Sequence, residues 1–192
     1  MYLVFDTETT GLPKKWDAPV TDLDNWPRMV QIAWILYDDD GNEVEAASYI
    51  VKPDGFEIPY EAQKVHGIST VRAMAEGEEL SKVLWEFTEA MNKAKYLVAH
   101  NISFDEKIVG AEFIRANIIF NNMSNLKKLC TKELSTDYCK IPGNYGYKWP
   151  NLSELHITLF KTHFEEAHNA ETDVRACARC FFELKKRKVI SI

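Results

Sequence analysis

The sequence predicts an α/β protein in which helices pack against a β-sheet. Three apolar or alternating stretches near the amino terminus are typical of strands, namely residues 1–6, 30–37 and 43–52. Three later stretches have helical composition, namely residues 80–93, 104–117 and 173–186. The strand and helix signals fall in one continuous chain, so we expect a sheet with helices packed on it.

The predicted strands come first. Residues 1–6 form an apolar run that ends at acids and threonines, which fits a short central strand delivering its carboxyl end to a functional site. The cluster Asp38-Asp39-Asp40-Gly41 has the composition of a turn between the second and third runs. We therefore expect an antiparallel meander, with residues 96–99 as a further strand.

The predicted helices each have one apolar side. Within residues 80–93, apolar side chains recur at helical spacing at Val83, Leu84, Phe87 and Met91. Residues 173–186 end in a basic tail, which suits the negative end of a helix dipole. By contrast, residues 139–151 are rich in glycine, tyrosine and lysine, and we expect an exposed loop there.

Composition and charge narrow the class of protein. The 192 residues are 46% hydrophobic and 27% charged, as in a globular protein, and we expect one domain over residues 1–192. The net charge of −6 argues against a protein that holds duplex DNA mainly by neutralising phosphates. No secretory leader and no run of about 18 apolar residues are present. We expect a cytoplasmic protein with no membrane partner.

The cysteines allow two readings. Cys177 and Cys180 form a C-x-x-C pair, and two further cysteines are available for zinc or redox chemistry. The pair lies in a helical, apolar stretch, where side chains three apart face the same way and cysteine acts as a small buried hydrophobe. We favour the buried reading.

Two acids mark the end of the first predicted strand. Asp6 and Glu8 are two residues apart on an extended segment, so their side chains project to the same face. An isolated Asp-x-Glu pair usually does no more than expose two acids to solvent. Here the segment continues as Thr9-Thr10-Gly11-Leu12, and the glycine allows a sharp turn beside the acids.

With this motif, DTETTGL, the sequence resembles the DnaQ-like exonuclease family, whose DEDD name refers to four acids in three motifs. The resemblance implies that Asp6 and Glu8 ligate metal. Residues 97–105, Leu-Val-Ala-His-Asn-Ile-Ser-Phe-Asp, match the second motif and imply Asp105 as the third ligand. Ser103 and Glu106 have capping-box spacing, which places Asp105 in the first helical turn. The alternative is an acid favoured there only by the helix dipole.

Residues 168–173, His-Asn-Ala-Glu-Thr-Asp, match the third motif and the DEDDh branch, which implies Asp173 as the fourth ligand and His168 as general base. If Asn169 caps the helix, His168 and Asp173 occupy positions that meet in a hydrophobic staple. Histidine suits the role because its ordinary pKa lies near neutrality. His156 and His163 read as structural, and His100 as support for the second motif.

Substrate contacts are expected by resemblance alone. Residues 59–68 are similar to the family segment that approaches the terminal nucleotide, which implies roles for Glu61 and His66; the alternative is an ordinary helix followed by a glycine. From the first two motifs the resemblance adds Thr9, Leu12, Asn101 and Phe104. Leu12 and Phe104 are expected to meet bases or sugar, although either can belong to the core.

The resemblance runs from residue 1 to about residue 184 and implies an RNase H-like fold, a mixed five-stranded sheet with helices on both faces. It implies two divalent ions, Mg²⁺ or Mn²⁺, with Asp6 bridging them, Glu8 and Asp173 on the ion that carries the attacking water, and Asp105 on the other. The expected reaction removes nucleoside 5′-monophosphates from the 3′ end of single-stranded or frayed DNA.

Three alternatives stay open. The same acids serve an exoribonuclease or oligoribonuclease that trims RNA, and they serve a proofreading subunit docked on a DNA polymerase. The third alternative is a non-catalytic module that keeps the fold and only docks; such a module has no need of the metal ligands and the base, all five of which this sequence retains. The tryptophan-containing loop after the first motif and the 139–151 loop depart from the family pattern. These departures bear on substrate preference and leave the metal ligands untouched.

Overall fold

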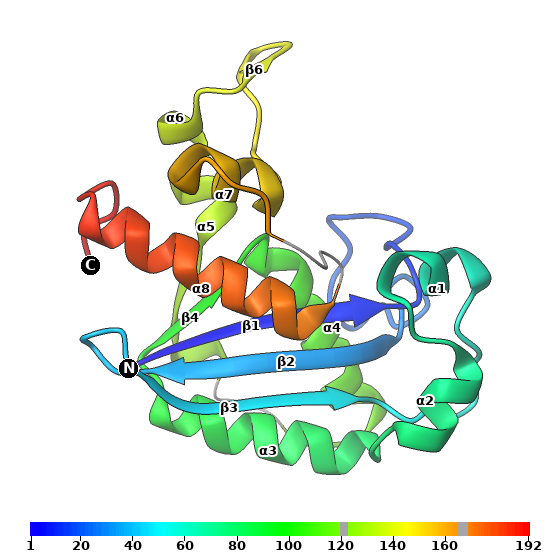
Figure 1. Cartoon of the computed structure of the whole chain (residues 1–192). Helices are drawn as coiled ribbons and strands as arrows, with labels where there is room; N and C mark the ends of the chain where they lie inside the picture. Colours follow the sequence, from blue (N-terminus) through cyan, green and yellow to red (C-terminus); the bar gives the residue numbers. More distant parts are fainter. Residues whose placement is uncertain (120–122, 165–168) are drawn as a thin grey trace.

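The computed structural model describes residues 1–119, 123–164 and 169–192. Its centre is a five-stranded sheet with the order β3-β2-β1-β4-β5 (Figure 1). The strands are β1 (Tyr2–Thr9), β2 (Met29–Tyr37), β3 (Glu43–Ile50), β4 (Tyr96–Ala99) and β5 (Lys127–Cys130). The first three pair antiparallel, whereas β4 and β5 run parallel to β1. The expected mixed sheet with an antiparallel meander is therefore confirmed.

Strand β1 is longer than its apolar run. We expected it to end at residue 6, but Asp6 pairs with Ala33 and Glu8 with Gln31, and the strand continues to Thr9. The polar residues remain in the sheet because β2 supplies their backbone partners. A register shift between Glu8 and Thr9 ends the regular pairing. The two acids thus lie inside a paired strand, which fixes the face toward which they point.

Helices cover both faces of the sheet, as expected (Figure 1). They are α1 (Tyr60–His66), α2 (Thr70–Glu76), α3 (Leu80–Lys93), α4 (Ile102–Arg115), α5 (Thr131–Leu134), α6 (Thr136–Cys139), α7 (Leu152–Phe160) and α8 (Ala170–Lys186), with a 3₁₀ turn at Met123–Asn125. Side chains of β1 alternate between the two faces of the sheet and pack in two separate hydrophobic cores. Phe5 packs on Phe87 of α3, and Tyr2 packs on Phe181 of α8. One core holds α3 and α4, and the other holds α7 and α8.

The start of α4 differs from the expectation. The capping box of Ser103 and Glu106 is wrong, because the helix already begins at Ile102 and Ser103 lies within it. Asn101 precedes the helix in the left-handed region, with φ of 80°, and Glu106 pairs with Lys128. Asp105 nevertheless occupies the first turn. The expected position of Asp105 is correct, although the reason given for it is not.

Two segments extend from these layers. Residues 139–151 are mostly exposed, as expected, and contain a short hairpin of β6 (Pro142–Gly143) and β7 (Gly146–Tyr147) that projects from the body of the protein (Figure 1). Cys177 and Cys180 are buried on α8 as free thiols, in line with their reading as small hydrophobes. Among the described residues, no helix is both long enough and apolar enough to cross a bilayer.

Candidate active site

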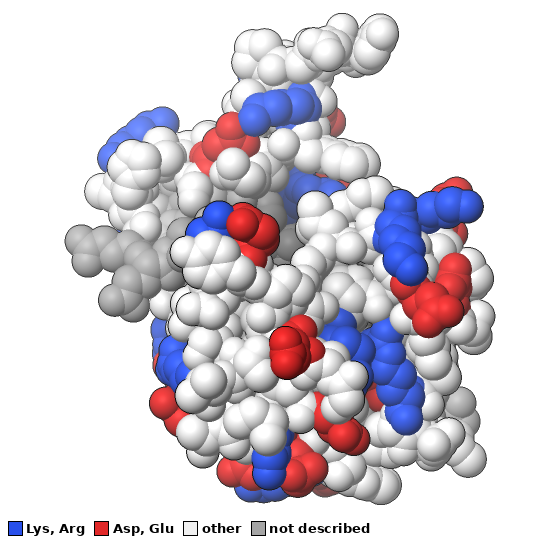
Figure 2. Space-filling model, turned by 90° about the vertical axis from the view of Figure 1, so that its right-hand side faces the viewer, with Lys and Arg blue, Asp and Glu red and all other residues white. Residues whose placement is uncertain are grey.

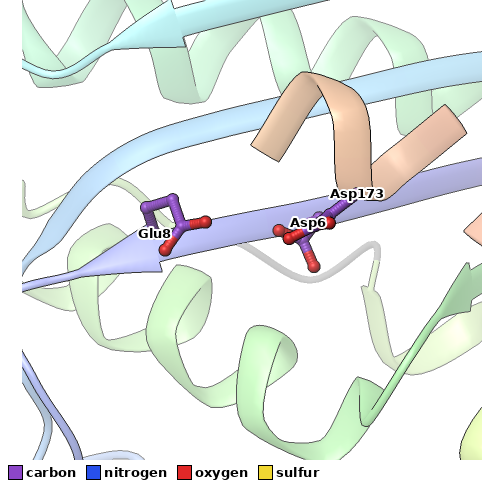
Figure 3. Close-up of side chains that lie close together, drawn as sticks. All are labelled: Asp6, Glu8 and Asp173. Carbon is purple, nitrogen blue, oxygen red and sulfur yellow. The ribbon is translucent and has the colours of Figure 1, made fainter. Parts of the chain in front are cut away.

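Three acids meet at the end of β1. Asp6 and Glu8 project from the strand and Asp173 from the first turns of α8 (Figure 3). One carboxylate oxygen of each lies within 4.8 Å of one from each of the others. The strand brings its two acids to one face because side chains alternate with a period of two. The sequence-predicted ligands Asp6, Glu8 and Asp173 are therefore brought together.

The start of α8 is fixed by two polar side chains. Asn169 caps the helix as expected, since its side chain accepts a hydrogen bond from the Glu171 backbone at 3.0 Å. Gln31, buried on β2 opposite Glu8, accepts one from the Ala170 backbone at 3.3 Å. These bonds tie the helix that carries Asp173 to the strand beside Glu8. Sequence reasoning did not single out Gln31.

The fourth predicted ligand, Asp105, lies beside this group and is held by the strand itself. Thr7 donates from its backbone nitrogen and its hydroxyl to the same oxygen of Asp105, at 3.1 and 2.7 Å. Thr7 lies between Asp6 and Glu8 but points to the other face, toward α4. Asp105 is only 3% exposed. The position of Asp105 therefore depends on Thr7. The alternation of β1 predicts the face to which Thr7 points, but not this partner 98 residues away.

The pKa values of the acids in this site are raised, mainly by burial and, for Asp6 and Glu8, also by the neighbouring carboxylates. Burial, followed by the charges of Asp173 and Asp105, raises the pKa of Glu8 to about 8. Burial also raises the pKa of Asp105 to about 7, although the hydrogen bonds from Thr7 lower it. The pKa of Asp6 is raised well above its usual range by burial and then by Asp105, Asp173 and Glu8.

This donor set fits hard divalent cations. Asp6, Glu8 and Asp173 form a cluster of carboxylates, with Asp105 beside it, and carboxylate oxygens are the ligands that Mg²⁺ and Mn²⁺ prefer. A bound cation offsets the repulsion that, after burial, raises the pKa values of Asp6 and Glu8. The chemistry of the donors therefore matches a hard divalent cation better than a thiolate-bound zinc ion.

A cavity of about 420 Å³ opens beside Glu8. It brings together five of the six expected substrate residues, namely Thr9, Leu12, Glu61, His66 and Phe104. They come from the end of β1 and the loop that follows it, from α1 and from α4. Leu12 is exposed, so its side chain is available to a ligand. Acids and cavity adjoin, which is the arrangement needed to hold one end of a chain-like substrate at a reactive group.

The sixth expected substrate residue, Asn101, is not among the described residues that line the cavity. It has a left-handed backbone conformation and accepts a hydrogen bond from Lys132 at 2.5 Å. The neighbouring His100 contacts the Thr131 hydroxyl at 2.9 Å and the Pro150 carbonyl at 3.1 Å. Burial lowers the pKa of His100 to about 4, so the ring is neutral near pH 7 and supports the second motif.

The remaining histidines differ in surroundings. His66 is buried, and its Nδ1 accepts a hydrogen bond from the Ile68 backbone at 3.1 Å. Burial lowers the pKa of His66, and the backbone of Thr9 partly opposes this. His156 is buried and pairs with the Thr162 carbonyl, in line with a structural role, while His163 is exposed. His168 lies outside the described residues.

Charged side chains of both signs are mixed on the face of the protein shown in Figure 2. On the face in Figure 2, which looks at the right-hand side of Figure 1, lysine and arginine side chains are interspersed with aspartate and glutamate. They do not form one continuous basic stripe on this face. A ligand that approaches here meets mixed charge, so local contacts matter more than a broad electrostatic field.

The order of the sheet, its two helical layers and the acids at one end of β1 define an RNase H-like α/β protein. Residues 3–181 match the model of a family described as exonuclease. The chain therefore belongs to this exonuclease family, within the DnaQ-like group of the RNase H-like superfamily. The resemblance noted in the sequence is confirmed.

Several known proteins are similar to this chain. It is 29% identical over 187 residues to the 3′-5′ exonuclease DinG of Bacillus subtilis, covering 97% of this chain and 18% of DinG. It is 26% identical over 183 residues to the DNA polymerase III subunit epsilon of Treponema pallidum, covering 94% and 74%. It is 31% identical over 193 residues to the PolC-type DNA polymerase III of Clostridium perfringens, covering 97% and 11%.

The fold is shared with E. coli exonuclease I in complex with a dA16 oligonucleotide, with a TM-score of 0.75 and 20% identity, over 97% of this chain and 41% of the other. A likeness at this identity concerns the fold. The chain thus spans less than a fifth of DinG and about two-fifths of that exonuclease I chain.

Proposed function

We propose that this chain is a metal-dependent 3′-5′ exonuclease that removes nucleoside 5′-monophosphates from single-stranded or frayed nucleic acid. The observation that carries the proposal is the meeting of Asp6, Glu8 and Asp173 within 4.8 Å, with Asp105 alongside, in a group whose member Glu8 also lines the cavity. Membership of the exonuclease family, and the relative named as the 3′-5′ exonuclease DinG, support hydrolysis from the 3′ end.

Asp6, Glu8, Asp105 and Asp173 would hold two divalent cations, Mg²⁺ or Mn²⁺. Such cations, when bound, activate a water and stabilise the leaving 3′-oxygen. His168 accepts the proton of the attacking water, a role for which a group titrating near neutrality is suited. The chain's other task is to place the terminal phosphate beside these carboxylates.

The cavity supplies that placement. Leu12 and Phe104 provide apolar surface for the terminal base and sugar, while Thr9, Glu61 and His66 offer polar groups in the same space. The terminal nucleotide must leave its partner strand to enter, because the cavity is bounded by β1, α1 and α4. Single-stranded or frayed ends are therefore the preferred substrates. DNA is the favoured polymer, with RNA as the alternative.

The test follows release of nucleotides from matched single-stranded DNA and RNA labelled at either end, with Mg²⁺ or Mn²⁺. Stepwise shortening from the 3′ end, absent in Asp6→Ala and in EDTA, is the expected result. The faster of the two polymers identifies the sugar that the site prefers. A wild-type protein that cleaves neither polymer with either cation contradicts the proposal and leaves a docking module.

A DNA polymerase is the protein partner that the relatives support, since two of them are named as DNA polymerase III subunits or PolC-type polymerases. Co-purification of the chain with the replicative polymerase of its own cell, in near-equal amounts, is the expected result. A chain that purifies alone while retaining full exonuclease activity would instead act independently.

A further inference from the structure

The loop between β1 and β2 contains an aromatic side chain that the site described above does not use. Trp16 lies in this loop, and its side chain is 55% exposed. Its ring centroid is 5.7 Å from that of Phe104, at an angle of 49°. Phe104 in turn lines the cavity beside Glu8. Trp16 therefore contacts the aromatic side chain that lines the cavity and lies next to the cavity.

The backbone around Trp16 is fixed by buried and charged partners. The side chain of Asn25 exchanges two hydrogen bonds with Lys15, accepting from its nitrogen at 2.7 Å and donating to its carbonyl at 2.9 Å. Lys107 of α4 donates to the Trp16 carbonyl at 3.2 Å and to the Ala18 carbonyl at 3.0 Å. These bonds hold the chain on both sides of Trp16 and tie the loop to the helix that carries Phe104.

The indole itself gains little from folding. A tryptophan usually stabilises a protein by burying its large apolar surface, and here more than half of that surface stays in water. By contrast, Trp26 in the same loop is buried and donates to the Pro19 carbonyl at 3.0 Å. The loop therefore has its own core residue, and the fixed, exposed ring of Trp16 is available to a ligand.

We propose that Trp16 is a stacking platform for the base next to the terminal nucleotide of a single strand. This inference rests on the proposed function, since it assumes that the terminal nucleotide occupies the cavity lined by Phe104. A strand leaving that cavity past Phe104 meets Trp16 first. Base–aromatic stacking is tolerant of sequence, so the platform binds any of the four bases.

The charges of the loop favour a base over a phosphate as the group that Trp16 meets. The loop between β1 and β2 carries three basic residues and three acids, namely Lys14, Lys15, Arg28, Asp17, Asp22 and Asp24. These charges leave no excess of positive charge along the loop to neutralise a backbone phosphate. An uncharged aromatic face remains as the feature that attracts the strand.

The test compares Trp16→Ala with the wild type on a labelled single strand, on the same strand with an abasic residue next to the 3′-terminal nucleotide, and on the p-nitrophenyl ester of thymidine 5′-monophosphate. Trp16→Ala should weaken binding of the intact strand by about five- to a hundredfold, the range of one lost base stack. The abasic strand should bind wild type and variant equally. The ester has one nucleoside and should be hydrolysed at the wild-type rate by both.

Two further variants serve as controls. Trp16→Phe keeps an aromatic face and should retain most of the affinity. Trp85→Ala removes an equally exposed tryptophan, 58% exposed on α3, and should leave every measurement unchanged. Thermal unfolding of each variant shows that the fold is kept, which is expected because the loop is held through its backbone.

Binding is measured in EDTA, where hydrolysis stops, so that the outcome is separate from that of the proposed function. Weaker binding of Trp16→Ala to the intact strand alone supports the platform even if no hydrolysis is found. Equal binding of wild type and Trp16→Ala to the intact strand overturns it even if the wild type is an active exonuclease. Equal losses on the intact and abasic strands also overturn it, because the contact is then with the sugar-phosphate backbone.

Discussion

Thr7 donates two hydrogen bonds to a single oxygen of Asp105, from its backbone nitrogen at 3.1 Å and from its hydroxyl at 2.7 Å. It lies between Asp6 and Glu8 on β1 and therefore sets the distance between the acids of the strand and the acid of α4. Both bonds lower the pKa of Asp105, against the burial that raises it to about 7.

Thr7→Val removes the hydroxyl at nearly constant volume. The pKa of Asp105 should then rise further, so protons compete better with the cation and the Mg²⁺ concentration needed for half-maximal hydrolysis at pH 7 increases by about tenfold. The defect should shrink at pH 9, where Asp105 is ionised in both proteins. Thr88→Val removes a hydroxyl that bonds to the Leu84 carbonyl on α3 and should leave the magnesium requirement unchanged. A Thr7→Val defect of equal size at both pH values would contradict this account.

The metal-free protein should lose stability between pH 6.5 and pH 8. The pKa of Glu8 is raised from 4.5 to about 8, so the folded state retains a proton that the unfolded state has released, and the free energy of unfolding falls as pH rises through this interval. The pKa of His100 is lowered from 6.5 to about 4, which gives the opposite slope but only below pH 6.5. Thermal unfolding at pH 6.5 and pH 8 in EDTA measures the effect, and magnesium should reduce the difference. A metal-free protein that is more stable at pH 8 would contradict the raised pKa of Glu8 and its cause in burial and neighbouring acids.

Asp6→Asn should reduce hydrolysis and increase the stability of the metal-free protein. The substitution removes a buried carboxyl whose pKa the folded state raises, so folding at pH 8 no longer costs the free energy of protonating or crowding that acid, and the metal-free protein should unfold at a higher temperature than the wild type. Hydrolysis should fall by at least about a hundredfold. Unfolding in EDTA and a nucleotide-release assay on the same sample measure both changes. An inactive variant that is also less stable without metal would point to a structural role for Asp6.

Glu112 is a buried acid whose loss should weaken the fold. It accepts hydrogen bonds from Arg28 and Arg115 and from the Met29 backbone, each at 2.9 Å, and so ties α4 to the start of β2. Glu112→Ala leaves both arginines without their acid and should cost about 3 kcal/mol in urea unfolding. Glu106→Ala on the same helix breaks a half-exposed pair with Lys128 and should cost less than about 1 kcal/mol. Equal costs for the two would show that burial of Glu112 does not matter.

His168→Ala should keep magnesium binding and lose turnover by about a hundredfold or more, the usual contribution of a general base. The measurement is kcat at saturating magnesium, with the magnesium requirement determined in parallel. His163→Ala, which removes an exposed histidine from the same connection between α7 and α8, should behave as the wild type. Turnover at the wild-type rate in His168→Ala removes His168 from the mechanism.

The features predicted correctly from the sequence depend on residues that are close together in the chain. The face shared by Asp6 and Glu8 follows from strand alternation, and the Asn169 cap follows from helix-start chemistry; both are found in the structure. Helix α7 was not singled out, although Asn151 and Glu154 form the capping box that marks its start. The spacing of Asn151 and Glu154 is therefore sufficient to predict the start of α7 from the sequence.

Contacts between residues that are far apart in the sequence cannot be predicted from these local patterns. Gln31 and Ala170 are 139 residues apart, and Arg28 and Glu112 are 84 apart, so nothing in the local pattern pairs them. Helix α4 begins early because Asn101, which was expected to contact substrate, precedes the helix in a left-handed conformation. The fold class and the acids are thus encoded locally, whereas the bonds that align them depend on the completed fold.

The meeting of Asp6 with Asp173 has a consequence for the life of the chain in the cell. The two residues lie near opposite ends of the sequence, so a chain still attached to the ribosome has the acids of β1 long before α8 is made. The proposed cleavage centre therefore forms only when synthesis of α8 is finished and the helix has docked. If the proposed function holds, we expect a nascent chain, or one clipped before α8, to leave nearby nucleic acid intact.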